Sequence, residues 1–401
     1  MSVRSLLLAL LAIVLVAAAC GDDDEPAAAA PTTTAAPTPA PEPPPEPPPA
    51  PAEAPSGAPT PNNGEQFVVA WTPYTDPTND LNVAFDNQVE KTITDAGMKH
   101  VYCSGKATAV DQSNCIDQFI AQNVDIILIY PADVDAMAEK IKDANAAEIP
   151  VGSFFGNIPD VGQEQLYTLT IPVYDAGVLN GHKLVEYLTE KNGEPKGTVL
   201  EITGLMTTSQ AQDRNAGFHS VVDGYPDIEV TIRNGDYDTA KAGTITTDWF
   251  TANPDTDAIY IHSNCDYTPS VRSALEALDL YVTKDDPGHI GIFGTDGCNS
   301  SLHEVRCGFQ DYGTTYPTDV AAAQMAQIAV HYLQTGESPQ PGETVNIPGL
   351  EGGNVAMVEG SGGPIYFMEL IEYTQDTAND PTLFGNSFMS EPNGLTSCDD
   401  R

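Results

Sequence analysis

Basic residues are scarce in this sequence. Its 401 residues include 16 Lys and Arg against 57 Asp and Glu, which gives a formal net charge of -41 at pH 7. A surface this negative repels phosphate backbones and anionic headgroups, so the composition argues against nucleic acid and anionic membrane surfaces as partners. The acids are scattered rather than clustered, which favours a strongly hydrated surface suited to salty surroundings over a site for a cationic substrate.

Catalytic motifs are also missing. The sequence contains no GxSxG nucleophile turn, no HExxH zinc motif and no phosphate-binding loop. Ser209 and His219 fall on one predicted helix, but without the turn that exposes a nucleophile. Carboxylates are so numerous that no pair of them indicates acid–base chemistry. We therefore expect neither enzymatic activity nor a cofactor.

Long apolar runs are absent after the N-terminus. The run at 6–16 follows Arg4, is too short to span a bilayer, and is typical of a secretory signal peptide. Small residues stand directly before Cys20, as in the lipoprotein processing box, where the cysteine is lipidated and becomes the new N-terminus. We predict a signal peptide over 1–20 and a lipid anchor on Cys20. Cleavage by the ordinary signal peptidase is the alternative.

Residues 21–65 consist largely of Pro, Ala, Thr and Glu. The proline-rich run at 43–49 cannot form helix or sheet, because proline lacks the N–H and fixes φ. An extended polyproline-like chain covers roughly 3 Å per residue. We predict a disordered stalk that carries a folded body on the order of 100 Å from the membrane. The alternative is a ligand for a proline-binding module.

From residue 66 onward, apolar strands alternate with amphipathic helices. The first series has predicted strands at 67–71, 100–103, 125–131 and from 149, with helices at 82–96, 111–122 and 136–147. The second has helices at 176–191, 209–223, 241–251 and 270–278 around strands at 197–202, 228–232, 258–262 and 290–294. This alternation predicts an α/β fold with two doubly wound parallel sheets. Because ligands bind beyond the carboxyl ends of parallel strands, we expect one cleft between the two units.

Short motifs along residues 66–345 resemble those of the type I periplasmic sugar-binding proteins, of the ribose- and galactose-binding kind. The segment QNVDIILIYPAD at 122–133 is similar to the family's "QGVDGIIIAPxD". RNAGF at 214–218 is similar to "RxxGF", and GTDG at 294–297 to "GFDG". Their order and spacing together carry the resemblance.

The resemblance implies two lobes joined by a three-segment hinge, with crossings near 169–170, near 316–317 and after Gly342. Hinge motion about these segments would close the lobes around a ligand. The implied N-terminal lobe comprises 66–168 and 317–342, and the implied C-terminal lobe 169–316 and 343–371. The placement of the tail at 372–401 stays open.

The resemblance also implies ligand contacts from the second lobe. Arg214, Asn264 and Asp296 match its polar contacts, Tyr237 matches an aromatic wall, and Tyr316 falls where the family often carries a hinge glutamine. Such residues make the directed hydrogen bonds and ring contacts that a polyol needs. The alternatives are structural: an exposed helix arginine, a turn asparagine, a helix-capping aspartate and two packing tyrosines.

The first lobe departs from the family pattern. The Asp-Arg pair of the ribose and galactose binders falls on Phe155 and Gly156, and the loop after the first strand offers Tyr74 and Asp76 in place of paired phenylalanines. We take Tyr74, Asp76 and Phe155 as candidate ligand contacts. Losing the pair leaves a more aromatic half-site, which argues against ribose and galactose and for a flatter or less hydroxylated ligand.

Six cysteines remain if Cys20 is lipidated, and six cysteines allow 15 pairings. Spacing favours Cys103 with Cys115, Cys298 with Cys307, and by elimination Cys265 with Cys398. A zinc site from Cys298, His303 and Cys307 is the alternative, disfavoured because the spacing is not CxxC and oxidising surroundings favour disulfides. We therefore predict no metal.

These observations together predict a monomeric, extracytoplasmic, lipid-anchored binding protein. It would capture a small polar ligand, a sugar or polyol, and deliver it to an ABC-type permease. Two alternatives stay open: a ligand-sensing receptor for a chemotaxis or kinase partner, and a binder of nucleosides or other small metabolites.

Overall fold

Two largely parallel sheets form the framework of the chain. The computed structural model describes residues 58–155, 158–360, 362–387 and 398. The strand order is β13-β14-β5-β4-β3-β1-β2 in the first sheet and β15-β10-β9-β8-β6-β7 in the second. Strand pairs are parallel except at one edge of each sheet, where β13 pairs with β14 and β15 with β10 in antiparallel fashion. The predicted α/β fold with two doubly wound sheets is confirmed.

The elements of the first sheet come from both ends of the described chain. Its strands are β1 (Val68–Thr72), β2 (Lys99–Tyr102), β3 (Ile126–Ile129), β4 (Val151–Phe154), β5 (Tyr167–Thr170), β13 (Val358–Gly360) and β14 (Gly363–Phe367). Its helices are α1 (Asp80–Asp95), α2 (Ala109–Ala121), α3 (Val134–Ala146) and α9 (Thr318–Thr335). A small separate ribbon follows α9, formed by β11 (Thr344–Val345) and β12 (Val355–Ala356).

The second sheet uses the middle of the chain. Its strands are β6 (Gly197–Thr203), β7 (Ile228–Asn234), β8 (Ala258–Ile261), β9 (Gly291–Thr295), β10 (Tyr312–Thr315) and β15 (Ile371–Tyr373). The accompanying helices are α4 (Val173–Asn192), α5 (Ser209–Val222), α6 (Thr239–Ala252), α7 (Asn264–Ala277), α8 (Asn299–Arg306) and α10 (Phe384–Ser387).

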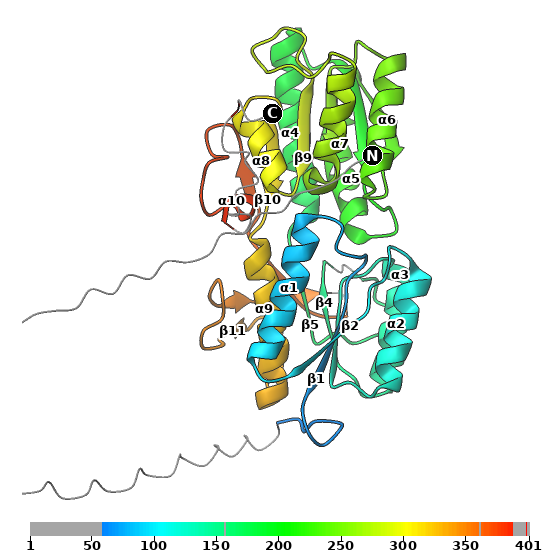
Figure 1. Cartoon of the computed structure of the whole chain (residues 1–401), viewed down its shortest axis with the longest axis vertical. Coiled ribbons are helices and arrows are strands. Elements are labelled where there is room, and N and C mark those ends of the chain that lie inside the picture. Colours follow the sequence, from blue (N-terminus) through cyan, green and yellow to red (C-terminus); the bar gives the residue numbers. More distant parts are fainter. Residues whose placement is uncertain (1–57, 156–157, 361, 388–397, 399–401) are drawn as a thin grey trace, which may run out of the picture. The chain divides into compact units, whose positions relative to one another are not determined.

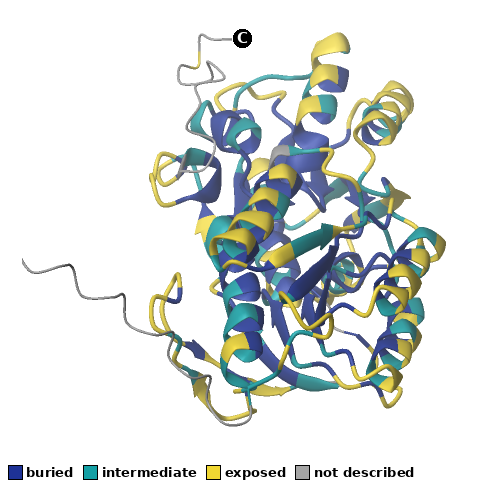
Figure 2. Ribbon diagram, turned by 60° about the horizontal axis from the view of Figure 1, so that its bottom comes forward, coloured by how far each residue is buried: buried dark blue, intermediate teal, exposed yellow. Residues whose placement is uncertain are grey.

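Alternating side chains bury both faces of each sheet. In β1, Val69 and Trp71 join the core beneath α1 and α9, whereas Val68 and Ala70 join the core beneath α2 and α3. Figure 1 shows these two helix pairs on opposite sides of the first sheet. Successive residues of a strand point to opposite faces, so an uninterrupted apolar strand requires helices on both sides. Figure 2 shows the buried strands inside and exposed outward helix faces.

Polar caps fix where the helices begin. Asn79, Thr108, Asp133 and Ser263 stand just before α1, α2, α3 and α7, and each side chain accepts a hydrogen bond from the backbone N–H three residues later. This capping satisfies an N–H that the helix itself leaves unpaired. In these strand–helix units the capping residues therefore gather beyond the carboxyl ends of the strands.

The third crossing between the sheets lies later in the chain than predicted. We assigned residues 343–371 to the C-terminal lobe, but β14 pairs with β5 of the first sheet, with Phe367 opposite Thr170. The chain then enters the second sheet at Ile371, opposite Thr315 of β10. The crossing after Gly342 was wrong because the hairpin of β13 and β14 continues the first sheet, where it covers the edge that β5 would otherwise expose.

Three disulfides join the described cysteines: Cys103–Cys115, Cys265–Cys298 and Cys307–Cys398. The first was predicted, and the other two predicted pairings were wrong. Cys298 and Cys307 flank the two ends of helix α8, and nine residues at the helical rise separate them by about 13 Å. A disulfide needs Cα atoms within about 7 Å, so these two cannot pair. Both are used in other disulfides, which removes two ligands of the alternative zinc site.

The signal peptide, Cys20 and most of the predicted stalk lie outside the described residues. None of the helices in the described part of the chain combines the length and apolarity that crossing a bilayer requires.

Candidate ligand-binding site

A small cavity with about 20 Å³ of free space lies where strands of both sheets end. Small-molecule sites run from about 300 to 1,000 Å³, so side chains nearly fill this one in the arrangement described. From the side of the first sheet it is lined by Tyr74, Asn79, Leu81, Asn82 and Tyr130. From the side of the second sheet it is lined by Arg214, Tyr237, Ser263, Cys265, Asp266 and Asp296, and Tyr316 lines it from the second crossing.

Five of the eight predicted contacts thus come together at this cavity: Tyr74, Arg214, Tyr237, Asp296 and Tyr316. They arise from segments up to 242 positions apart, between Tyr74 and Tyr316 (316 − 74). The other three, Asn264, Asp76 and Phe155, are not among the lining residues.

Arg214 supplies the buried positive charge of the site. It lies on α5, is 3% exposed, and donates from Nη2 to Asp296 Oδ1 at 3.0 Å and from Nη1 to the carbonyl of His262. Its Nε is buried and has no hydrogen-bond partner among the described residues. The alternative interpretation as an exposed helix arginine is therefore wrong. A guanidinium stays charged, so this arginine can hold an acceptor on a ligand while it is neutralised by Asp296.

Asp296 is held in place through its backbone. It follows β9 with a φ of 77°, and its carbonyl accepts hydrogen bonds from Asn264 Nδ2 at 3.0 Å and from Tyr373 Oη at 2.7 Å. Asp296 does not cap the next helix, since the cap of α8 is Cys298. Asn264 therefore lies outside the lining of the cavity and supports the backbone of Asp296.

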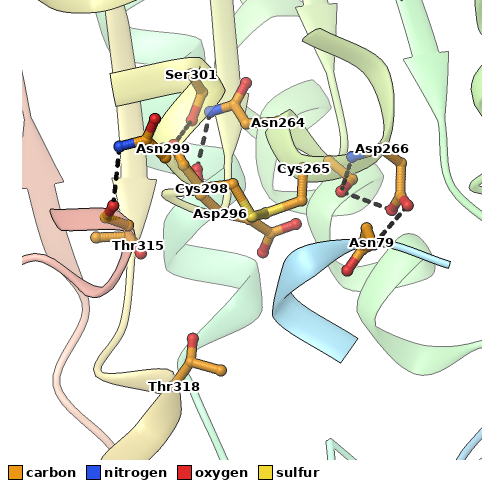
Figure 3. Close-up of a disulfide and its surroundings, with 12 residues drawn as sticks. Asn79, Asn264, Cys265, Asp266, Asp296, Cys298, Asn299, Ser301, Thr315 and Thr318 are labelled. Atoms are coloured by element: carbon orange, nitrogen blue, oxygen red, sulfur yellow. Dashed lines mark hydrogen bonds between the residues drawn. A yellow bond between two sulfur atoms is a disulfide. The ribbon is translucent and has the colours of Figure 1, made fainter. Parts of the chain in front are cut away.

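Asp266 is a site residue that our motif reasoning missed. Its carboxylate accepts hydrogen bonds from Asn79 Nδ2 at 2.6 Å and from Ser263 Oγ at 2.8 Å, which joins the start of α1 to the start of α7 (Figure 3). Burial raises the pKa of Asp266 to about 6, opposed by these two hydrogen bonds, and the nearby Asp296 carboxylate raises it further.

Aromatic rings surround much of the remaining cavity. Ring centroids lie 4.7 Å apart for Tyr74 and Tyr130, 5.3 Å for Tyr130 and Phe155, and 5.2 Å for Phe155 and Tyr316. Phe155 thus packs behind the lining tyrosines. Burial raises the pKa of Tyr74, Tyr130 and Tyr316 well above the ordinary value and that of Tyr237 to about 12. Their hydroxyls are therefore protonated at neutral pH and can donate hydrogen bonds.

Backbone strain marks three predicted residues. Phe155, Tyr237 and Asp296 have φ values of 53°, 58° and 77°, a region that non-glycine residues seldom adopt. Such conformations persist where the surrounding structure holds them, and they gather at functional sites. Gly204 accommodates the ring of Tyr237, because a Cβ at this position would lie 2.0 Å from Cζ of the tyrosine.

Several hydrogen bonds connect the two sides at the start of α5. Thr207 Oγ1 donates to the carbonyl of Ala132 at 2.8 Å, Ser209 Oγ to that of Phe155 at 2.9 Å, and Gln210 Nε2 to Tyr130 Oη at 2.9 Å. The two sides are thus joined by direct contacts beside the cavity.

A buried acid lies behind Arg214. Glu201 of β6 accepts hydrogen bonds from Nε2 of His219 and of His262, each at 2.8 Å, and the carbonyl of His262 in turn holds Arg214. Burial alone would raise the pKa of Glu201, but the hydrogen bonds from the two histidines lower it to about 2. The hydrogen bond with Glu201 raises the pKa of His219 to about 9, whereas burial lowers the pKa of His262.

Four of the missed lining residues share a position that was visible in the sequence. Tyr130 directly follows the apolar strand β3, Asn79 and Ser263 are helix caps, and Asp266 lies in the first turn of α7. The rule that ligands meet the carboxyl ends of parallel strands would have selected all four. Asp76, in contrast, is an exposed loop residue.

A model of the periplasmic binding protein domain family matches residues 69–338 of the chain. The ribose import binding protein of Bacillus subtilis is 27% identical over 245 residues, which cover 61% of this chain and 74% of that protein. The galactofuranose-binding protein of Escherichia coli is 32% identical over 139 residues, which cover 34% of this chain and 42% of that protein.

Two crystal structures have a similar fold. A galactofuranose-binding protein superposes with a TM-score of 0.64 at 19% identity, covering 79% of this chain and 97% of the other. A solute-binding protein of an ABC transporter from Mycobacterium smegmatis, with bound glycerol, superposes with a TM-score of 0.63 at 19% identity, covering 78% and 96%. At that identity the likeness is one of fold.

Proposed function

The chain belongs to the periplasmic binding protein domain family, and from this premise we propose that it captures a sugar or polyol of monosaccharide size between its two lobes. Closure about the three crossings would enclose the ligand, and an ABC-type permease in the membrane would receive it. The family consists of solute-binding proteins. We propose accordingly that the protein releases its ligand chemically unchanged.

The observation that carries this proposal is the buried Arg214–Asp296 pair at the wall of a small cavity lined by tyrosines. The pair offers charged donors and acceptors to hydroxyl groups, and the rings offer apolar faces to the carbons of a sugar. Relatives with similar sequences are named for binding ribose, galactofuranose and D-apiose. These names support a sugar as the ligand class.

A nucleoside or similar flat metabolite is a second candidate. It is favoured by the ring contacts of Tyr74 with Tyr130 and with Tyr237, at centroid distances of 4.7 and 6.1 Å. A flat nucleobase can stack on aromatic rings of this kind.

A thermal-shift screen tests both candidates. The full chain would be heated with D-ribose, L-arabinose, D-allose, myo-inositol, glycerol, adenosine, and alanine as a control. A ligand that binds only the folded state raises the melting temperature by mass action, so we expect a shift with at least one sugar or polyol. A shift with adenosine alone supports the second candidate. No shift with any of these compounds contradicts both.

We also propose that the protein is extracytoplasmic and held at the membrane by a lipid on Cys20. Replacement Cys20→Ser should move the protein from the membrane fraction to the soluble fraction of cells. A variant that stays with the membrane contradicts the anchor but leaves the ligand proposal unaffected.

A further inference from the structure

The Cys265–Cys298 disulfide joins the two segments that carry the carboxylates of the site. Cys265 directly precedes Asp266 at the start of α7, and Cys298 follows Asp296 by two residues at the start of α8. Figure 3 shows the sulfur–sulfur bond next to the side chain of Asp296, with Asp266 beyond Cys265. We propose that this disulfide is a positioning brace that fixes Asp266 and Asp296 relative to one another, so that ligand affinity depends on it beyond its contribution to folding. The inference rests on the proposed function.

The disulfide joins the first turn of α7 to the loop that leads into α8, and the sheet does not fix these two segments relative to one another. They follow the neighbouring parallel strands β8 and β9, whose ladder of backbone hydrogen bonds ends before the acids begin. Asp296 adopts a left-handed φ of 77°, and its neighbours Asn264 and Tyr373 hold its carbonyl rather than its carboxylate. The direction of that carboxylate therefore depends on Arg214 and on the course of the backbone as far as Cys298.

Charge repulsion opposes the observed arrangement. Asp266 and Asp296 line the same small cavity, and the guanidinium of Arg214 forms its hydrogen bond with Asp296 alone of the two. Like charges in a buried site tend to move apart or to take up a proton. A covalent link between the first turn of α7 and the loop before α8 resists that separation. Cys265 and Cys298 are 8% and 3% exposed, so the link is packed into the core at the cavity wall.

The remaining disulfides are matched controls. Neither Cys103–Cys115 nor Cys307–Cys398 contributes a residue to the lining of the cavity. The sequence separations are 12 for Cys103–Cys115, 33 for Cys265–Cys298 and 91 for Cys307–Cys398. A disulfide that closes a longer loop removes more entropy from the unfolded chain. The loss of stability on removal of each disulfide should therefore increase with loop length. Removal of Cys265–Cys298 should give the intermediate loss.

The test compares three double variants of the full chain, in which each disulfide in turn is replaced by two alanines. Melting temperatures and titration calorimetry with D-ribose and with myo-inositol would be measured for each. We expect Cys265→Ala/Cys298→Ala to lose about tenfold or more in affinity for whichever probe the wild-type protein binds, since a hydrogen bond to a charged group is worth that factor. The controls should lose less than about twofold, although Cys307→Ala/Cys398→Ala melts lowest.

Affinity losses that follow the ranking of stability would overturn the proposal, as would an unchanged affinity in the brace variant. If the alanine pair fails to fold, Cys265→Val/Cys298→Ala fills the volume without the covalent link. Recovered stability without recovered affinity supports the brace, and recovery of both overturns it.

Hydrogen exchange of the ligand-free proteins separates this inference from the proposed function. Loss of the brace should accelerate amide exchange at 263–268 and 295–299 and leave the strands β8 and β9 unchanged. If the wild-type protein binds neither probe, sugar binding is in doubt, and this measurement alone decides the brace. No local acceleration overturns it.

Discussion

The two sides of the cavity differ in chemistry. The side next to the first sheet carries rings, two amides and Leu81, and no charged group among its described lining residues. The opposite side carries Arg214, Asp266 and Asp296. Fixed charges are costly to bury and rigid in direction, whereas rings cover a ligand without dictating its orientation. From this difference we expect the second lobe to orient a ligand and the first mainly to exclude water from it.

The largest effect should follow from removal of the buried guanidinium. Arg214→Ala removes the donors of the charged side and leaves Asp296 buried without its ion-pair partner. We expect a loss of at least about 100-fold in affinity for the ligand found in the screen, measured by calorimetry. The free energy of unfolding should fall by about 3–5 kcal/mol.

Two further variants serve as controls for Arg214→Ala. Arg233→Ala removes an exposed arginine that lies over the ring of Trp249, and it should leave affinity unchanged. Arg214→Met/Asp296→Asn should regain stability but not affinity, because it removes both buried charges together. Wild-type affinity in Arg214→Ala would contradict the expectation that the second lobe orients the ligand.

A smaller loss should follow from crowding of the aromatic wall. Gly204→Ala places a methyl group 2.0 Å from Cζ of Tyr237, so the ring must move. Overpacking typically costs about 1–3 kcal/mol, which corresponds to an affinity loss of about tenfold or more if the cost falls on the closed state. Gly224→Ala, where the nearest atom is a carbonyl at 3.2 Å, is the control. Equal affinities of the two variants would show that Tyr237 does not contact the ligand.

The acidic side of the cavity should also make ligand affinity depend on pH, which the uncharged side cannot do. Burial raises the pKa of Asp266 to about 6 against the lowering effect of its hydrogen bonds, and access of water in an open state would return the pKa toward about 4. The closed state then binds a proton that the open state releases. Lowering the pH from about 7 to 5 should therefore raise affinity by about tenfold.

Asp266→Asn should abolish this pH dependence, which titrations at a series of pH values would reveal. The other charged groups that face Asp266 are Asp296 and Arg214, and neither is replaced in this variant. An unchanged profile would assign the pH dependence to a different group.

The smallest effect is expected on the aromatic side. Tyr130→Phe keeps the ring and removes the hydroxyl that accepts a hydrogen bond from Gln210 at 2.9 Å. One such bond is worth about 0.5–1.5 kcal/mol, so affinity should fall by about threefold. A loss as large as that of Arg214→Ala would mean that both sides orient the ligand equally.

The second lobe was the more predictable of the two from sequence. Arg214 and Asp296 lie in short motifs that resemble those of the sugar-binding family, and the structure places both at the cavity. In the first lobe, the loop after β1 carries no such motif, so Asn79 was missed and exposed Asp76 was selected instead. Tyr130 lies in the 122–133 motif, but it was not selected as a ligand contact.

Two disulfide pairings and the third crossing were mispredicted because they depend on contacts between segments that are distant in the sequence. Cys265 and Cys298 meet because β8 and β9 are neighbours in the sheet, a relation that spacing along the chain does not contain. The pairing of β14 with β5 likewise joins segments about 200 positions apart and depends on which sheet edge is free. Local patterns therefore predicted the elements, and tertiary neighbours decided the disulfides and the third crossing.

The three crossings also restrict the degrees of freedom between the sheets. Thr170 is paired with Phe367 where two of the crossings leave the first sheet, and Thr315 with Ile371 where two meet the second. Connectors tied together at their ends resist torsion and sliding far more than they resist bending. Relative motion should then reduce to a single angular coordinate, and one spin-label distance across the cavity would suffice to describe it.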